Sequence, residues 1–243
     1  MMGITRWAVC TLGLGMLCHL GLAVAEPGEL PEGYRVAQQV LVGDGSVLEV
    51  LEDLRITPQL HAASWGNSLD AEAFDESEDG DQPPALEAQA RWLADSGEVL
   101  AQKALGYPLA TVEKAPLNGL PSPVFFLTVD QTAPMGSYSG PATEILMPLQ
   151  HQLDPVLFVS ESGEKHPLVL AQTGKAAWQI VAASGGATES IQQVSSASSA
   201  DNEEFVTTYR TYRYLNGQWT TAGRQQAGYW DTESEFPPPA NFP

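Results

Sequence analysis

The first 25 residues have the three-part composition of a cleavable secretory signal peptide, which limits how the rest of the chain can fold. Arg6 precedes an apolar stretch, and the small residues at 23–25 form the small-x-small pattern that a signal peptidase recognises. Both cysteines, Cys10 and Cys18, lie inside this segment. We therefore expect a mature chain that begins near Glu26, forms no disulfide and depends on a hydrophobic core for stability.

The expected destination is the bacterial periplasm. The apolar stretch is short for a membrane span, which needs about 20 residues. Neither cysteine follows the small residues that precede a lipidated cysteine, so a lipid anchor is not expected. No asparagine lies in an N-x-S/T glycosylation motif. We expect no membrane insertion after the signal peptide is removed.

The chain is strongly acidic. It has 30 acidic and 11 basic residues, a formal net charge of −19, and every acidic residue follows position 25. Nucleic acids and anionic lipids require a basic footprint, so neither is an expected partner. Such a charge keeps a protein soluble and attracts a basic partner protein.

The predicted fold class is α+β and rich in β-structure, with antiparallel hairpins and one amphipathic helix. An acidic α+β region is expected over 26–115, with a hairpin in which 34–42 and 47–56 pair across a Gly-Asp-Gly turn. The helix is predicted over 84–105 because apolar residues recur there every three or four positions. These residues are Leu86, Ala90, Leu93, Gly97, Leu100 and Ala104.

A β-rich region is expected over 124–236, after a linker or long turn at 116–123. The expected strands include 124–129, 156–159 and 178–181, and the Ser-, Ala- and Gly-rich stretch 185–200 is predicted to be a flexible loop. The dipeptide Asn216-Gly217 separates two β-prone runs, 204–215 and 218–221, and predicts a two-residue hairpin turn. The Pro-rich tail 237–243 is expected to be unstructured, as is Phe236 before it.

This C-terminal hairpin carries the candidate binding residues. Tyr, Trp and Arg are enriched at interface hot spots because they bury much area at low entropic cost. Strand alternation puts one set on each face, and one face must pack on the core, so part of the cluster is expected to be structural. The candidate residues are Tyr209, Arg210, Tyr212, Arg213, Tyr214 and Trp219.

Other motifs do not predict a catalytic or metal-binding site. The acidic stretch 75–81 resembles the first half of an EF-hand calcium loop, but Leu86 stands where the bidentate glutamate belongs. Gly136–Gly140 has Tyr138 where a nucleophile elbow needs serine. The histidines outside the signal peptide show no metal-binding spacing, so no metal and no cofactor is expected. These histidines are His61, His151 and His166.

These observations favour an exported, non-enzymatic binding protein, such as an inhibitor or immunity protein that neutralises a toxin or hydrolase in the cell envelope. Two alternatives remain open. The first is an exported hydrolase acting on cell wall or carbohydrate through a carboxylate pair, because so many acids always supply some pair. The second is a structural or assembly factor of the envelope.

Overall fold

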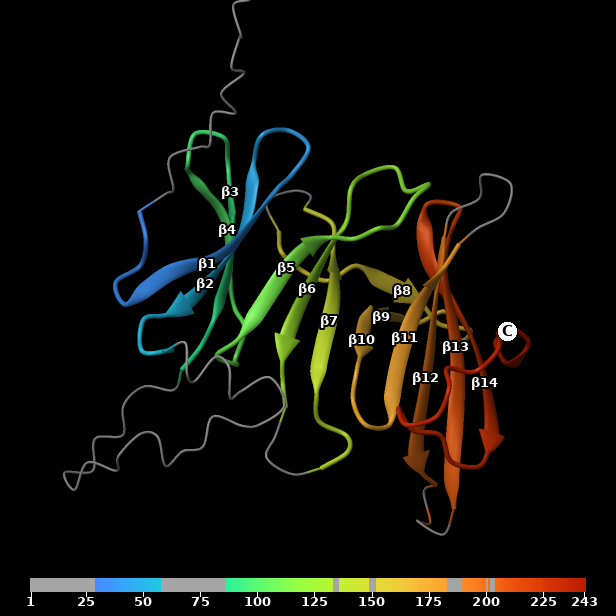
Figure 1. Cartoon of the computed structure of the whole chain (residues 1–243). Coiled ribbons are helices and arrows are strands. Elements are labelled where there is room, and N and C mark those ends of the chain that lie inside the picture. The colour runs from blue at the N-terminus through green and yellow to red at the C-terminus, as the bar shows by residue number, and fades with distance from the viewer. Residues whose placement is uncertain are drawn as a thin grey trace, which may run out of the picture.

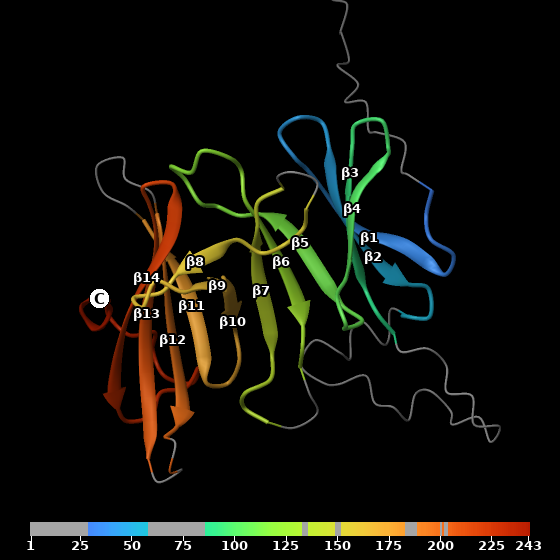
Figure 2. The same cartoon turned by 180° about the vertical axis from the view of Figure 1, so that it is seen from behind.

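The computed structural model describes residues 29–57, 86–132, 136–148, 152–182, 189–199, 201 and 204–243. In these residues the chain forms fourteen β-strands arranged as three sheets, and the only helix is one short 3-10 turn. The sheets lie side by side across the molecule, from the β1–β4 sheet at one end to the sheet that contains β11–β14 at the other (Figures 1 and 2). The predicted α+β class is therefore wrong, because the described fold is all-β.

The first sheet is a four-stranded antiparallel meander in the order β1-β2-β3-β4. The strands are β1 (Tyr34–Leu41), β2 (Val47–Asp53), β3 (Gln89–Leu93) and β4 (Val99–Ala104). The predicted N-terminal hairpin is confirmed, since β1 and β2 pair from Tyr34↔Asp53 to Leu41↔Val47. Gly45 in its turn has φ of 90°, which glycine adopts without a steric penalty.

The predicted helix over 84–105 is wrong, because the described part of this segment, from residue 86 onward, forms the β3–β4 hairpin. Of the apolar residues at helical spacing, Ala90 and Leu93 belong to β3 and Leu100 and Ala104 belong to β4. Successive side chains of β3 point to opposite faces of the sheet, and this period of two places Ala90 and Trp92 together in the core. Gly97, in the turn between the strands, has φ of 84°. Packing against a second sheet therefore favoured the strand over the helix, although the sequence shows helical spacing.

The middle sheet has the strand order β10-β7-β6-β5 and is antiparallel throughout. Its strands are β5 (Ala110–Lys114), β6 (Phe125–Asp130), β7 (Pro141–Leu146) and β10 (Val169–Ala171). The predicted strand at 124–129 is confirmed as β6. The stretch 116–123 connects β5 to β6, which pair directly with each other.

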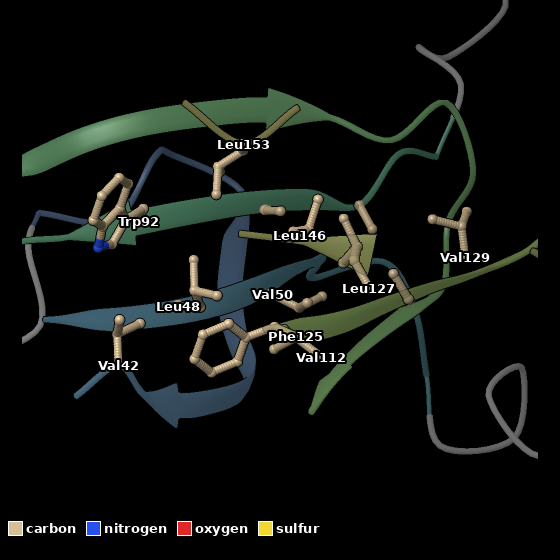
Figure 3. Close-up of a cluster of buried hydrophobic side chains, with 13 residues drawn as sticks. Val42, Leu48, Val50, Trp92, Val112, Phe125, Leu127, Val129, Leu146 and Leu153 are labelled. Atoms are coloured by element: carbon tan, nitrogen blue, oxygen red, sulfur yellow. The ribbon is translucent and has the colours of Figure 1, made fainter. Parts of the chain in front are cut away.

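Both faces of the middle sheet are buried. Phe125 and Leu127 of β6 pack against Leu48, Val50 and Trp92 of the first sheet (Figure 3). The opposite face of the middle sheet packs against the third sheet. Its core residues include Phe126, Ile145, Leu170, Ile191, Tyr212 and Trp219. This double burial explains why β6 is a nearly continuous hydrophobic run.

The third sheet has the order β11-β12-β13-β14-β8-β9. Its strands are β8 (Leu157–Val159), β9 (Lys165–Pro167), β11 (Ala176–Val181), β12 (Ser190–Ser198), β13 (Phe205–Leu215) and β14 (Gln218–Ala227). The predicted strands at 156–159 and 178–181 are confirmed as β8 and β11. The loop predicted over 185–200 is wrong where the structure describes it, because β12 runs between two partner strands.

The predicted C-terminal hairpin is confirmed together with its register. Leu215 pairs with Gln218 and Tyr214 pairs with Trp219 across a two-residue turn. Asn216 and Gly217 in the turn have φ values of 51° and 86°, as a type I′ turn requires.

The tail was predicted to be unstructured, and this is wrong. Pro239–Asn241 forms a 3-10 turn, and Phe236 stacks on Phe242 with ring centroids 5.6 Å apart. Phe242 and Trp230 belong to a third hydrophobic cluster, on the outer face of the third sheet. The tail therefore covers a sheet face that would otherwise expose aromatic side chains.

Candidate binding surface at the C-terminal hairpin

The structure divides the six candidate binding residues between the two faces of the β13–β14 hairpin. Tyr212, Tyr214 and Trp219 belong to the core between the middle and third sheets. Tyr209 faces the opposite way and belongs to the cluster covered by the tail. The six residues thus lie on two paired strands, but they do not share one surface.

On the inner face, Tyr212 is anchored by rings and by a hydrogen bond. It is 2% exposed, its ring lies 5.1 Å from that of Phe158, and its hydroxyl donates to Oε1 of Gln193 at 3.2 Å. Burial raises the pKa of the Tyr212 hydroxyl, and nearby Arg210 opposes this rise. Tyr212 therefore serves mainly as a structural residue.

On the outer face, Tyr209 and Arg213 contact the tail. The Tyr209 ring lies 5.4 Å from that of Phe242, edge to face, and the Arg224 guanidinium lies 5.6 Å from the Tyr209 centroid. Nη2 of Arg213 donates to the main-chain oxygen of Pro243 at 2.8 Å. These contacts occupy the outer face of the hairpin with residues of the same chain.

A groove of about 800 Å³ opens at the turn end of the hairpin. Tyr214 is half-buried there, and its ring lies 5.8 Å from that of Trp219 in an edge-to-face contact. The indole N–H of Trp219 is buried and has no hydrogen-bond partner. Side chains that complete the groove wall include Met147, Asp154, Leu157, Lys165, Pro167 and Gln218.

Sequence reasoning missed the residues that make this a groove. Leu157 lies in β8 and Lys165 in β9, and both line the groove because β8 pairs in parallel with β14 beside Trp219. Leu157 is 49% exposed, so its side chain is accessible at the groove wall. No local pattern connects residues 157 and 165 with residue 219, so only the strand pairing could reveal the groove.

A second cluster that the sequence did not predict surrounds Lys175. Its Nζ lies 4.3 Å from the ring centroid of Tyr138, 4.6 Å from that of Phe205 and 5.6 Å from that of Tyr229. Hydrogen bonding to Lys175 is the largest cause of the lowered pKa of Tyr138. The ammonium group therefore joins the Gly136–Gly140 turn to the third sheet through cation–π contacts.

Of the remaining candidate residues, His166 and the Gly136–Gly140 turn lie in the part of the chain that the structure describes. His166 is exposed, with Nε2 3.7 Å from Oε2 of Glu164. The acidic stretch 75–81, His61 and His151 lie outside the described residues. Within the described ranges, no group of three His, Cys, Asp or Glu side chains could hold a metal ion. Across those same ranges, no helix has the length and apolar character needed to cross a membrane.

Comparisons with known proteins returned nothing: no protein-family model, curated protein or solved structure matches this chain.

Proposed function

We propose that this chain is an exported, non-enzymatic binding protein that holds a basic partner protein in the periplasm, in the manner of an inhibitor or immunity protein. The observation that carries the proposal is the groove at the hairpin turn, where Tyr214 and Trp219 lie beside the exposed Leu157. Aromatic and large apolar side chains in a recess are the usual anchors of a protein interface.

The charge of the chain supports a basic partner. A net charge of −19 attracts a positively charged protein over distances of about 8–10 Å at physiological ionic strength. Such steering raises the association rate more than it strengthens the final complex. An acidic inhibitor would thus find a basic toxin or hydrolase rapidly and would hold it through the apolar groove.

The composition of the groove favours binding over hydrolysis. Carboxylate-based glycoside hydrolysis needs two acidic side chains that face each other across a cleft. In the part of the groove wall that the structure describes, Asp154 is the one carboxylate. The groove therefore lacks a described acid–base pair, while its Tyr, Trp, Met and Leu side chains suit a partner's apolar segment.

Affinity capture with matched variants tests this proposal. Residues 26–243 would be immobilised, exposed to exported proteins of the source cell, and washed with increasing salt. We expect one basic protein to be retained stoichiometrically, and Leu157→Asp in the groove wall to weaken its retention at least tenfold. Leu215→Asp is the control, because Leu215 is similarly exposed at 51% but does not line the groove.

Two outcomes would contradict the proposal. If both substitutions weakened retention equally, the groove would not be the binding site. If folded protein retained no partner at low salt, a binding function for this surface would be rejected, and turnover of wall fragments and glycans would be measured instead.

A further inference from the structure

A second hollow, of about 540 Å³, lies next to the groove. Strand β8 lies between the groove and this hollow. Leu157 and Val159 line the groove, and Phe158, on the other face of β8, lines the hollow. We call the second hollow the Arg210 pocket. The side chains that matter for its chemistry are Phe158, His166, Gln193, Arg210, Tyr212 and Thr221.

Arg210 is the charged group of this pocket. Three other arginines of the described chain, Arg35, Arg55 and Arg91, each pair with a carboxylate. Arg210 is exposed, and no carboxylate of the described ranges lies within ion-pair distance of it. Arg210 lines the pocket, and its guanidinium interacts with the Tyr212 hydroxyl. A guanidinium has five N–H donors, so without a carboxylate partner Arg210 keeps donors for an anion.

Neutral groups that can donate hydrogen bonds line the same pocket as Arg210. The carbonyl oxygen of the Gln193 side chain accepts from the Tyr212 hydroxyl at 3.2 Å, which leaves the Gln193 amide N–H groups to donate. Oγ1 of Thr221 is buried and has no hydrogen-bond partner in the structure. A buried hydroxyl without a partner costs free energy, and a ligand that it could reach by rotation would satisfy it.

One side of the wall is apolar, Ser160, Ser195 and His166 add polar groups elsewhere, and the described wall contains no carboxylate. Phe158, Val169 and Ala171 form an apolar side of the pocket. A volume of about 540 Å³ lies within the range of small-molecule sites. A ligand that fits this wall carries one anionic group on an apolar body.

Two carboxylates outside the wall limit the charge of that ligand. Oε1 of Glu161 accepts from the main-chain N–H of Gly223 at 3.0 Å, and Gly223 is the register partner of Arg210. Glu164 lies beside His166, on another side of the pocket. These negative charges disfavour an extended polyanion, whereas a small anion is attracted mainly by Arg210.

We propose that the Arg210 pocket binds a small organic anion, a carboxylate or a phosphate monoester attached to an apolar body. The Arg210 guanidinium contacts the anionic group, Gln193 and Thr221 donate to it, and Phe158 contacts the apolar body. This site is distinct from the protein-binding groove, so it does not depend on the proposed function.

Titration of residues 26–243 with four probes, followed by isothermal calorimetry and by NMR chemical shifts, tests this inference. The probes are 4-phenylbutyrate, phenyl phosphate, the neutral 4-phenylbutanamide and the cationic 4-phenylbutylamine. We expect saturable binding of at least one anion in the millimolar range or tighter, with shifts at Gln193 and Thr221. Comparison of the first two probes distinguishes carboxylate from phosphate recognition.

Matched variants then assign the contact. We expect Arg210→Gln to weaken anion binding about tenfold, as loss of a charge-assisted hydrogen bond does. Arg213→Gln, which removes the same charge from the opposite face of β13, is expected to leave binding within twofold. Equal loss in both variants, equal binding of the neutral amide, or no saturable binding of either anion by folded protein would overturn the proposal.

Discussion

Glu49 of β2 and Arg91 of β3 face each other across the first sheet and form an ion pair that is almost completely buried. Their side chains are 0% and 1% exposed. The Arg91 guanidinium donates to the Glu49 carboxylate through both Nε and Nη2, and Gln39 donates to the same carboxylate at 2.9 Å. Arg91 also donates to the main-chain oxygen of Glu29 at 2.9 Å. The buried charges are thus well hydrogen-bonded.

Removal of one partner is expected to leave the other charge buried and uncompensated. We predict that Glu49→Ala lowers the free energy of unfolding by about 3–5 kcal/mol. Urea denaturation followed by tryptophan fluorescence measures the change. The control is Arg35→Ala, which removes one partner of the more exposed Arg35–Glu52 pair on the neighbouring strands. A loss at position 49 no larger than in the control would show that the pair is not buried in solution.

The contact between Tyr209 and Phe242 predicts that the tail contributes to stability. Phe242 is 8% exposed and packs on Tyr209 and Phe236. We expect Phe242→Ala to cost about 3 kcal/mol, as truncation of a buried aromatic ring does. Thermal unfolding and near-ultraviolet circular dichroism report the loss. The exposed Leu215→Ala serves as the control, and equal midpoints for the two variants would mean that the tail does not cover this face.

Gly140 directly precedes β7 and lies against the connection between β10 and β11. It has φ of 156°, and an added Cβ would lie 2.3 Å from the main-chain oxygen of Gln172. Gly163 has φ of 86° and open space around it, so Gly163→Ala is expected to cost only the left-handed penalty of about 1–2 kcal/mol. We predict a larger loss for Gly140→Ala, measured by urea denaturation. A smaller loss than at position 163 would contradict the backbone contact.

The buried hydroxyl of Tyr212 predicts alkaline sensitivity. Burial raises its pKa in the folded state above the ordinary value of 10.0, so the folded protein resists deprotonation more than the unfolded chain does. The resulting stability is fully present below pH 10 and is lost as the pH rises through the folded-state pKa. We expect Tyr212→Phe to flatten the fall in unfolding free energy above about pH 10. Parallel curves for the two proteins would exclude this linkage.

Local chemistry predicted both hairpins correctly. The Gly-Asp-Gly cluster before β2 and the dipeptide Asn216-Gly217 supply positive φ angles where tight turns need them, and this requirement does not depend on distant residues. The turn length then determined the Tyr214–Trp219 pairing. Alternation along β13 also predicted that its aromatic residues divide between two faces.

The candidate surface could be predicted only in part. The sequence identified Tyr214 and Trp219, but the groove also needs Leu157 and Lys165, which β8 and β9 bring beside the hairpin. The sequence also identified Arg210, but the pocket around Arg210 is formed by residues of β9, β12 and β14. Pairing between strands far apart in the chain has no local sequence pattern, so these neighbourhoods could not be predicted.

The sequence by itself determined the turns of the β1–β2 and β13–β14 hairpins, and its composition left the region after residue 25 without cysteine and strongly acidic. Tertiary structure decided the rest. The segment over 84–105 has helical spacing, yet it forms β3 and β4, because as strands it buries Trp92 against the middle sheet. The Ser- and Ala-rich β12 has little strand propensity of its own, and it is a strand because β11 and β13 satisfy its main-chain hydrogen bonds on both sides.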